Sequence, residues 1–229
     1  MIPHYLAALR YQAAWLDVEP ERLQGDSFIH PTSKRVMKIP GYSSPVRVHA
    51  LRMEGQDEIY AACAPGLERE LRKLCLKKSK RHRFFYFEEL NPAIDISQAR
   101  ALSEEDLPAF LRFFKEAYPD TRDYGWIPEY FSGIVNQRKC FGIYEGEKLV
   151  SVADAPTIPY LPELVVEPGI MTLPEFRRKG CAAAVCAAFI KEQLSRGFSP
   201  IWTCAADNGG SAGLALHLGY RPFGVLWRM

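Results

Sequence analysis

The sequence lacks the patterns that mark the common nucleotide and metal sites. Its 229 residues contain no G-x-x-x-x-G-K-[ST] loop and no G-x-G-x-x-G turn after a strand, which disfavours nucleoside triphosphates and dinucleotides as ligands. The six cysteines form no C-x-x-C pair. We therefore expect no metal and no disulfide framework, and we interpret the cysteines as buried, reduced side chains.

Charge of one sign and long apolar runs are also missing. The 29 basic residues nearly balance the 27 acidic ones, so that the net charge is +2. We interpret the one basic run, Lys77–Arg83, as a solvated helix end and linker; a nucleic-acid arm is the alternative. No apolar stretch reaches the roughly 20 residues that span a bilayer, and the first residues lack the basic region of a signal peptide. These features predict a cytoplasmic protein with no nucleic-acid or membrane partner.

What the chain does contain is ordinary globular composition, with 48% hydrophobic residues. A change of pattern near Leu90 predicts two regions, 1–90 and 91–229. The first reads as a smaller α/β region with a helix from about Tyr5 to Leu16, a hairpin of strands at 46–53 and 58–64, and a helix at 67–78.

The second region alternates strands and helices. Ser103 and Asp106 resemble a capping box at the start of a helix that carries Leu107, Phe110, Leu111 and Phe114. Other expected helices cover 128–138, 180–196 and 211–219, and expected strands cover 94–102, 140–146, 148–156, 163–173, 199–207 and 220–229. Pro168-Gly169 predicts a bulge or kink inside the strand at 163–173. The order predicts a mixed α/β fold with a mostly antiparallel sheet.

The stretch "EFRRKGCAAAVCAAFIKEQL", residues 175–194, places cations and a glycine directly before a helix. A helix N-terminus has unpaired N–H groups and a partial positive charge. Gly180 and Ala182 would let a ligand approach the amides of residues 178–182, while Arg177, Arg178 and Lys179 add positive charge. The stretch predicts an anion site, and a basic loop without a ligand is the alternative that it leaves open.

Two motifs in order resemble a known family. Arg177-x-x-Gly180-x-Ala182, reached from a strand through Pro174, is similar to the R/Q-x-x-G-x-G/A motif of the GNAT superfamily of N-acetyltransferases. Asn208, Ser211, Leu214, Ala215 and "LGYRPFG" are similar to its N-x-x-[SA]-x-x-L…L-G-[FY]-x-x-x-G segment. The resemblance covers roughly Asp95 to the C-terminus. The phrases "PGIMTLPEFRRKG" and "PIWTCAADN" look most like bacterial GNAT proteins with an extra N-terminal half, which in some of them is itself a degenerate acetyltransferase-like fold.

The resemblance implies the GNAT acyl-CoA N-acyltransferase fold, with a V-shaped opening between the strands at 165–173 and 200–206. The pantetheine arm of acetyl-CoA would pair with backbone near Met171 and Thr172, and its pyrophosphate would lie on the amides of residues 178–182. The cofactor-binding residues expected on this basis are Met171, Thr172, Arg177, Arg178, Lys179, Gly180, Cys181, Ala182, Asn208 and Ser211. Acetyl-CoA is the only cofactor expected.

The catalytic groups are less well defined. Relatives often use a strand carboxylate as base, which points to Glu167 in preference to Glu163; a solvent-facing glutamate beside a bulge is the alternative. The family's usual tyrosine acid falls on Ala215, with His217 and Tyr220 nearby. Cys204 lies in an apolar strand, which is typical of a structural thiol rather than a nucleophile.

The acceptor side would include Asp154, residues 156–163, Trp126 and Tyr130, because acidic and aromatic groups suit a cationic amine. We therefore expect direct transfer of an acetyl group from acetyl-CoA to the amine of a small molecule in a ternary complex. A non-catalytic acyl-CoA sensor and a peptide or protein acetyltransferase are the alternatives. Residues 1–90 could complete the acceptor pocket or form a homodimer, and the sequence leaves both open.

Overall fold

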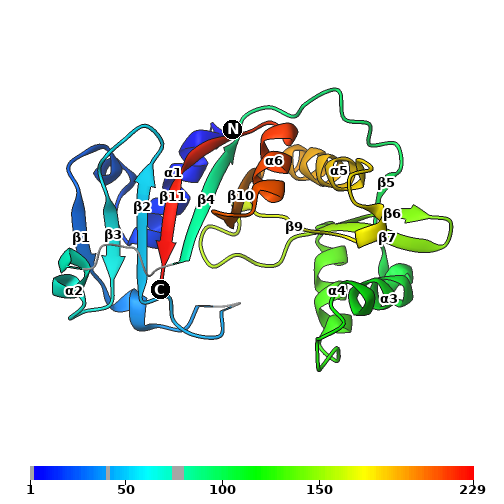
Figure 1. Ribbon diagram of the computed structural model, residues 1–229, viewed down its shortest axis with the longest axis horizontal. Coiled ribbons are helices and arrows are strands. Elements are labelled where there is room, and N and C mark those ends of the chain that lie inside the picture. The colour runs from blue at the N-terminus through cyan, green and yellow to red at the C-terminus, as the bar shows by residue number, and fades with distance from the viewer. Residues whose placement is uncertain (1–2, 40–41, 74–79) are drawn as a thin grey trace.

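The computed structural model describes residues 3–39, 42–73 and 80–229, which form two β-sheets with helices on their faces (Figure 1). The larger sheet has seven strands in the order β1-β3-β2-β11-β4-β10-β8, and the smaller has four in the order β5-β6-β7-β9. The larger sheet consists of β1 (Phe28–Pro31), β2 (Val48–Met53), β3 (Tyr60–Cys63), β4 (Lys80–Phe87), β8 (Val165–Val166), β10 (Ser199–Ala205) and β11 (Tyr220–Arg228). The smaller consists of β5 (Ala99–Ala101), β6 (Cys140–Glu145), β7 (Lys148–Asp154) and β9 (Gly169–Thr172). Only β1–β3 and β8–β10 pair in parallel, so the mixed, mostly antiparallel α/β fold is confirmed.

Helices cover these sheets because each has an apolar face. They are α1 (His4–Leu16), α2 (Glu68–Lys73), α3 (Leu107–Ala117), α4 (Ile127–Asn136), α5 (Cys181–Ser195) and α6 (Gly209–Leu218), with short 3₁₀ turns η1 (Pro20–Gln24), η2 (Ser33–Val36), η4 (Glu104–Asp106) and η5 (Pro174–Phe176). None of the helices in the described ranges is long and apolar enough to cross a bilayer.

Three clusters of buried side chains hold the layers together. Helix α1 packs on one face of the larger sheet, where Trp15 and Leu16 join Phe84 and Leu226. Helices α3 and α4 pack on one face of the smaller sheet. Helix α5 packs against both sheets, because the cluster around its buried Phe189 includes side chains of β4, β6, β7 and β10. Each fully buried Phe or Leu side chain stabilises the folded state by about 1.5–3 kcal/mol. Because the buried side chains of α5 contact both sheets, this helix is the main link between them.

The C-terminal strand joins the two ends of the chain. Strand β11 lies between β2 and β4, and Leu226 pairs with Leu51 on one side and with His82 on the other. The three strands β1, β2 and β3 are therefore the outer part of a sheet completed by residues far along the chain. Strands from both sides of the division expected near Leu90 belong to the larger sheet.

Most elements expected from the sequence are present, and two expectations were wrong. Residues 80–83 of the basic run form the first half of β4 rather than a linker; their alternation is hidden because residues 80, 81 and 83 are all exposed and basic. Residues 77–79, and the end of the helix expected at 67–78, lie outside the described residues. The strand expected at 163–173 is two strands, β8 and β9, in different sheets. The capping box is confirmed, since the Ser103 N–H donates to Asp106 Oδ2 at 2.8 Å.

The turn between α6 and β11 should tolerate no side chain. Gly219 has φ 101°, and an added Cβ would lie 1.7 Å from the carbonyl oxygen of Glu89. We expect Gly219→Ala to lower the free energy of unfolding by about 3 kcal/mol, from left-handed strain plus overpacking. Gly66 has φ 90° with no atom within 4 Å of an added Cβ, so Gly66→Ala should lower it by only about 1 kcal/mol. Urea unfolding measures both, and equal losses would contradict this account of the turn.

Candidate functional site

The two sheets separate where the chain passes from β8 to β9. Strand β8 pairs with the start of β10, Val165 opposite Ser199 and Val166 opposite Pro200. Strand β9 instead pairs with β7 in the other sheet. Glu167 and Pro168 lie at the point of separation, and in Figure 1 β9 runs away from β10. Among the described residues, β9 and the second half of β10 therefore keep one unpaired edge each, on the two sides of a V-shaped opening.

The unpaired edge of β9 is formed by particular backbone groups. The Leu173 N–H donates to the Val150 carbonyl at 3.0 Å, so residues 171 and 173 direct their backbone groups toward β7. Because successive residues of a strand alternate, Ile170 and Thr172 direct theirs away from β7, into the opening. The backbone pairing expected near Met171 and Thr172 stays a prediction, and the backbone groups that face the opening there are those of Ile170 and Thr172.

The edge of β9 leads directly to the N-terminus of α5. Gly180 is the N-cap, with φ 86°, and supplies no side-chain cap. The Ala184 N–H makes the bond to the Gly180 carbonyl at 3.0 Å, which leaves the N–H groups of residues 181–183 without an intrahelical partner. Gly180 is exposed, and no atom lies within 4 Å of where its Cβ would be. The geometry is that of an anion site.

The three cations before this helix differ in their roles. The Arg177 Nε donates to the Thr172 carbonyl at 3.0 Å, which ties the loop to β9. The Lys179 Nζ lies 4.9 Å from the centre of the Phe176 ring. Arg178 is exposed and has φ 62°. All three lie beside the helix N-terminus, and Arg177 also has a structural role that the sequence did not indicate.

Asn208 and Ser211, the residues expected from the second motif, make structural contacts. The Asn208 side chain caps α6 by accepting from the Ser211 N–H at 3.0 Å. The Ser211 hydroxyl in turn accepts from the Trp202 Nε1–H at 3.0 Å. These contacts fix α6 at the end of β10, and a role in holding the cofactor stays a prediction.

No obvious proton donor replaces the family's tyrosine. Ala215 is fully buried and packs in the core. His217 is exposed on the last turn of α6. Tyr220 is buried between Phe87 and Trp202, where burial raises its pKa. Cys204 is buried and its pKa is also raised by burial, which supports its interpretation as a structural thiol.

Glu167 lies at the separation of the sheets and is partly buried. Burial raises the pKa of its carboxyl, while hydrogen bonds from Thr203 and the positive charge of Arg228 oppose that shift. A carboxyl whose pKa is raised toward neutrality, beside an opening, has the properties of a general base. Glu163, the alternative, is exposed in the segment before β8.

A second carboxyl lies on the other side of the opening. Asp154, at the end of β7, accepts a hydrogen bond from the Tyr130 hydroxyl at 2.8 Å, and burial raises its pKa to about 6. It pairs with Gly169 at the start of β9, where an added Cβ would lie 2.7 Å from Asp154 Oδ1. Trp126 packs edge-on against Tyr130 with ring centres 5.5 Å apart. The structure thus brings together three of the residues expected on the acceptor side.

The segment expected to join them, residues 156–163, extends elsewhere. Its Tyr160 accepts a hydrogen bond from Arg35 Nη2 at 2.6 Å and packs edge-on against Trp15 of α1. Sequence reasoning did not find this contact between the first 40 residues and the segment before β8, because it spans 125 positions.

Comparison with known proteins agrees with this geometry. Residues 129–224 match the family model described as GNAT acetyltransferase. A GNAT-family acetyltransferase from Colwellia psychrerythraea superposes with a TM-score of 0.57 at 17% identity, over 72% of this chain and 63% of the other. A GNAT-family protein from Novosphingobium aromaticivorans gives 0.50 at 21% identity, over 74% and 84%.

A GCN5-related N-acetyltransferase from Sphaerobacter thermophilus gives 0.52 at 14% identity, over 66% of this chain and 51% of the other. The chain thus spans less than two thirds of the length of two of these three structures. At these identities the similarity shows a shared fold. No curated protein matches the sequence.

The stability contributions of Asp154 and Asp106 should respond to pH in opposite directions. Because the pKa of Asp154 is raised to about 6, the folded state binds a proton that the unfolded state has lost above about pH 4. Wild-type stability should therefore fall as the pH rises from 4 through 6. Asn at position 154 can still accept from Tyr130. The free energy of unfolding of Asp154→Asn, relative to that of the wild type, should therefore increase by about 1–2 kcal/mol as the pH rises from 4 to 7.5.

Asp106→Asn is the matched control with the opposite sign. The Arg100 guanidinium, the Ser103 N–H and the Tyr144 hydroxyl hold the pKa of Asp106 well below its usual range. The ionised form of Asp106 therefore stabilises the folded state above about pH 4. Asp106→Asn should be less stable than the wild type there, and this difference in the free energy of unfolding should shrink as the pH falls below that value. Urea unfolding of both variants from pH 3 to 7.5 measures the trends. A parallel response would show that Asp154 is not a buried, protonatable carboxyl.

Proposed function

We propose that this chain, which carries a GNAT acetyltransferase domain at residues 129–224, transfers an acetyl group from acetyl-CoA to the amine of a small molecule. The observation that supports this most strongly is the separation of β8 from β9. It gives an unpaired strand edge that leads straight to an uncapped helix N-terminus. A ligand with amide groups followed by a diphosphate is complementary to that sequence of donors and acceptors.

Each part of acetyl-CoA has a complementary group on the chain. The amides of the pantetheine arm can pair with the outward-facing backbone groups of Ile170 and with the Thr172 N–H, as an added strand would; the Thr172 carbonyl already accepts from Arg177. The diphosphate can accept from the N–H groups of residues 181–183, whose partial positive charge favours an anion. Arg178, exposed beside them, adds a charge-assisted contact at the rim.

The reaction requires the amine to attack the thioester while both are bound. The amine nitrogen forms a bond to the carbonyl carbon, the carbon–sulfur bond breaks, and CoA leaves as a thiolate. Glu167 accepts the proton that the amine loses, and burial favours this because it raises the basicity of the carboxylate. Ala215 cannot donate a proton to the thiolate. A thiol with a pKa near 8.5 is an adequate leaving group, and the thiolate can take its proton from water.

One observation favours a second function, a non-catalytic acyl-CoA sensor. The position of the usual acid is a fully buried alanine, and the nearby Tyr220 is enclosed by aromatic rings. Such a protein would bind acetyl-CoA and CoA without turning over any amine. The two experiments below distinguish this from the enzyme.

Charge at the N-cap of α5 should decide cofactor affinity. We expect Gly180→Asp to weaken acetyl-CoA binding about tenfold more than Gly180→Asn, or 1.4 kcal/mol, through repulsion of the diphosphate. The two side chains have the same size and tolerate the left-handed backbone of this residue similarly. Calorimetric titration with acetyl-CoA, CoA and ATP measures the affinities. Equal affinity of both variants would show that the diphosphate is bound elsewhere.

The role of Glu167 is tested by turnover. We expect Glu167→Gln to lower kcat about 100-fold, because the amine would lose its proton acceptor, while acetyl-CoA affinity stays unchanged. Glu163→Gln, a change of the same kind in the exposed segment before β8, should retain wild-type kcat. Release of free CoA thiol in the presence of an amine panel measures the rate. Wild-type turnover by Glu167→Gln would exclude Glu167 as the base, and no turnover by any form of the protein would favour the sensor.

A further inference from the structure

Polar side chains are concentrated on the α1 face of the larger sheet, where a core would be apolar. They are His49 of β2, Arg228 of β11, His82 of β4, Thr203 of β10 and Glu167 just after β8, and we call them the polar row. Alternation places them on the same face as the buried apolar side chains under α1. The row runs across neighbouring strands, from His49 in the first third of the chain to Glu167, the proposed base.

Helix α1 and the η2 turn cover this row with more polar groups. Gln12 Oε1 lies 3.0 Å from His49 Nε2, and the Trp15 ring stacks on His49 with centres 4.8 Å apart. Arg35, from η2, is fully buried and lies 5.1 Å from the Trp15 ring. Arg228 lies 4.6 Å from the same ring. Two guanidinium groups therefore share one aromatic side chain.

The cover of the row holds buried donors without a hydrogen-bond partner in the described chain. They are Gln12 Nε2, Arg35 Nε and Arg35 Nη1, all from fully buried side chains. An unpaired buried donor destabilises a folded protein, so such groups are normally rare. All three atoms are donors, and what is missing is an acceptor.

The charge of Arg35 has no ion-pair partner. None of the ion pairs in the described ranges includes Arg35, which is fully buried, or Arg228, which is partly exposed and whose charge acts on the carboxyl of Glu167. Asp17, the acid whose charge acts on Arg35, is already bound to Lys34 and Thr32. Burial lowers the pKa values of His49 and His82, so both rings are neutral at pH 7. Buried cations are normally paired, so Arg35 lacks the anion that would accompany it.

We propose that the polar row is the acceptor pocket and that Arg35 and Arg228 bind a carboxylate carried by the acceptor, as in an amino acid. This rests on the proposed function, because Glu167 at one end of the row would receive the proton of the amine. The charge of Arg228 acts on the carboxyl of Glu167 at the other end of the row. A guanidinium matches a carboxylate in shape and charge, and the unpaired amide of Gln12 can add a further donor.

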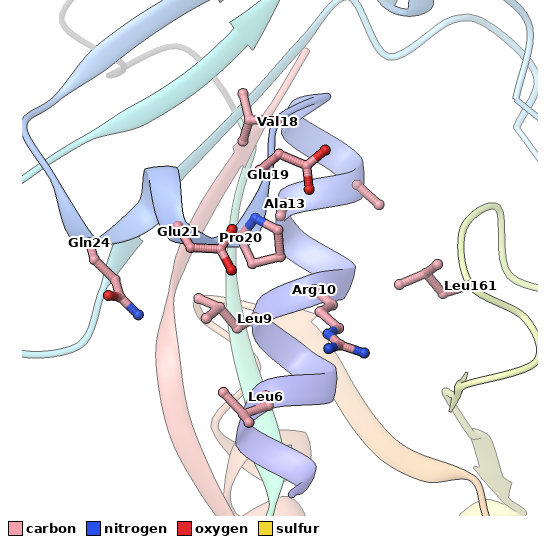
Figure 2. Close-up of a pocket in the computed structure, with 11 residues that line it drawn as sticks. Leu6, Leu9, Arg10, Ala13, Val18, Glu19, Pro20, Glu21, Gln24 and Leu161 are labelled. Atoms are coloured by element: carbon pink, nitrogen blue, oxygen red, sulfur yellow. The ribbon is translucent and has the colours of Figure 1, made fainter. Parts of the chain in front are cut away.

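Entry to the pocket involves the connection between β7 and β8. Its Tyr160 hydroxyl accepts from Arg35 Nη2, in the place that a carboxylate oxygen would take. Next to it, Leu161 lies across from Arg10 at a surface pocket of about 490 Å³ on the outer side of α1 (Figure 2). In this proposal a carboxylate replaces the Tyr160 hydroxyl, and the segment shifts outward to admit it.

The first test is binding to the intact protein. A panel of L-amino acids, each with its decarboxylated amine and its amide, is titrated in the presence of CoA, with thermal unfolding and calorimetry as readouts. We expect at least one amino acid to raise the Tm while its two carboxylate-free analogues do not. Arg228→Met should weaken that binding at least tenfold. Arg112→Met, which removes an exposed arginine from α3 on the other sheet, should leave it unchanged.

The second test separates a binding role of Arg35 from a structural one. If Arg35 is present for a ligand, Arg35→Met removes an unpaired buried cation, and the Tm of the ligand-free protein should stay the same or rise. The variant should also lose the Tm increase caused by the amino acid. A large fall in the ligand-free Tm would identify Arg35 as structural and overturn the proposal for this residue.

The outcomes separate this inference from the proposed function. Binding of acetyl-CoA with no amino acid bound, or with analogues bound equally well, overturns the carboxylate pocket and leaves the proposed function standing. Binding of an amino acid that depends on Arg228, without any binding of acetyl-CoA, overturns the proposed function and leaves the anion site.

Discussion

The structure depends on the passage of one chain segment between two sheets. Between Val166 and Gly169 the backbone leaves β10 and joins β7, so that no hydrogen-bonded ladder connects the two sheets at this point. The separation is maintained from both sides. Asp154 occupies the space where any side chain at Gly169 would lie, and α5 packs against both sheets at once. Unpaired backbone groups that would be unfavourable in a core thus become available to a ligand.

Two carboxyls of raised pKa flank this separation in different surroundings: Asp154 pairs with Gly169 at the start of β9, and Glu167 follows β8. Asp154 is bound to Tyr130 within the smaller sheet, whereas Glu167 lies at the start of a row of polar groups on the larger one. In both cases the cause is burial. The difference in their partners suggests a division of labour, in which Asp154 shapes the start of β9 and Glu167 faces the acceptor.

In the proposed acceptor pocket, the first 90 residues take part through the sheet that they share with the last strand. Residues of α1, η2 and β2 cover or contribute to the polar row, and Arg228 of β11 lies next to His49. This arrangement explains why an apparently separate region contains a buried arginine and a buried histidine. In this interpretation the N-terminal region completes the acceptor pocket.

The sequence by itself determined the local features of the protein. The helix periodicity around Phe110, the capping box at Ser103, the tight turn at Gly146 and the glycine before α5 all depend on neighbouring residues, and all were predictable. The expectation of an anion site at the helix N-terminus follows from the same local physics, and family resemblance added the expectation that the anion is the diphosphate of acetyl-CoA.

Only the tertiary structure decided what distant residues do together. Pro168-Gly169 indicated a break in a strand, but not that its two halves belong to different sheets, because strand pairing depends on partners far along the chain. The free edge at Ile170 rather than Met171 depends on which side of β9 faces β7. Arg35, His49 and Arg228 showed no motif, since their common property is a place around the Trp15 ring, which depends on packing. Burial and pairing are properties of the packed chain, and no local pattern contains them.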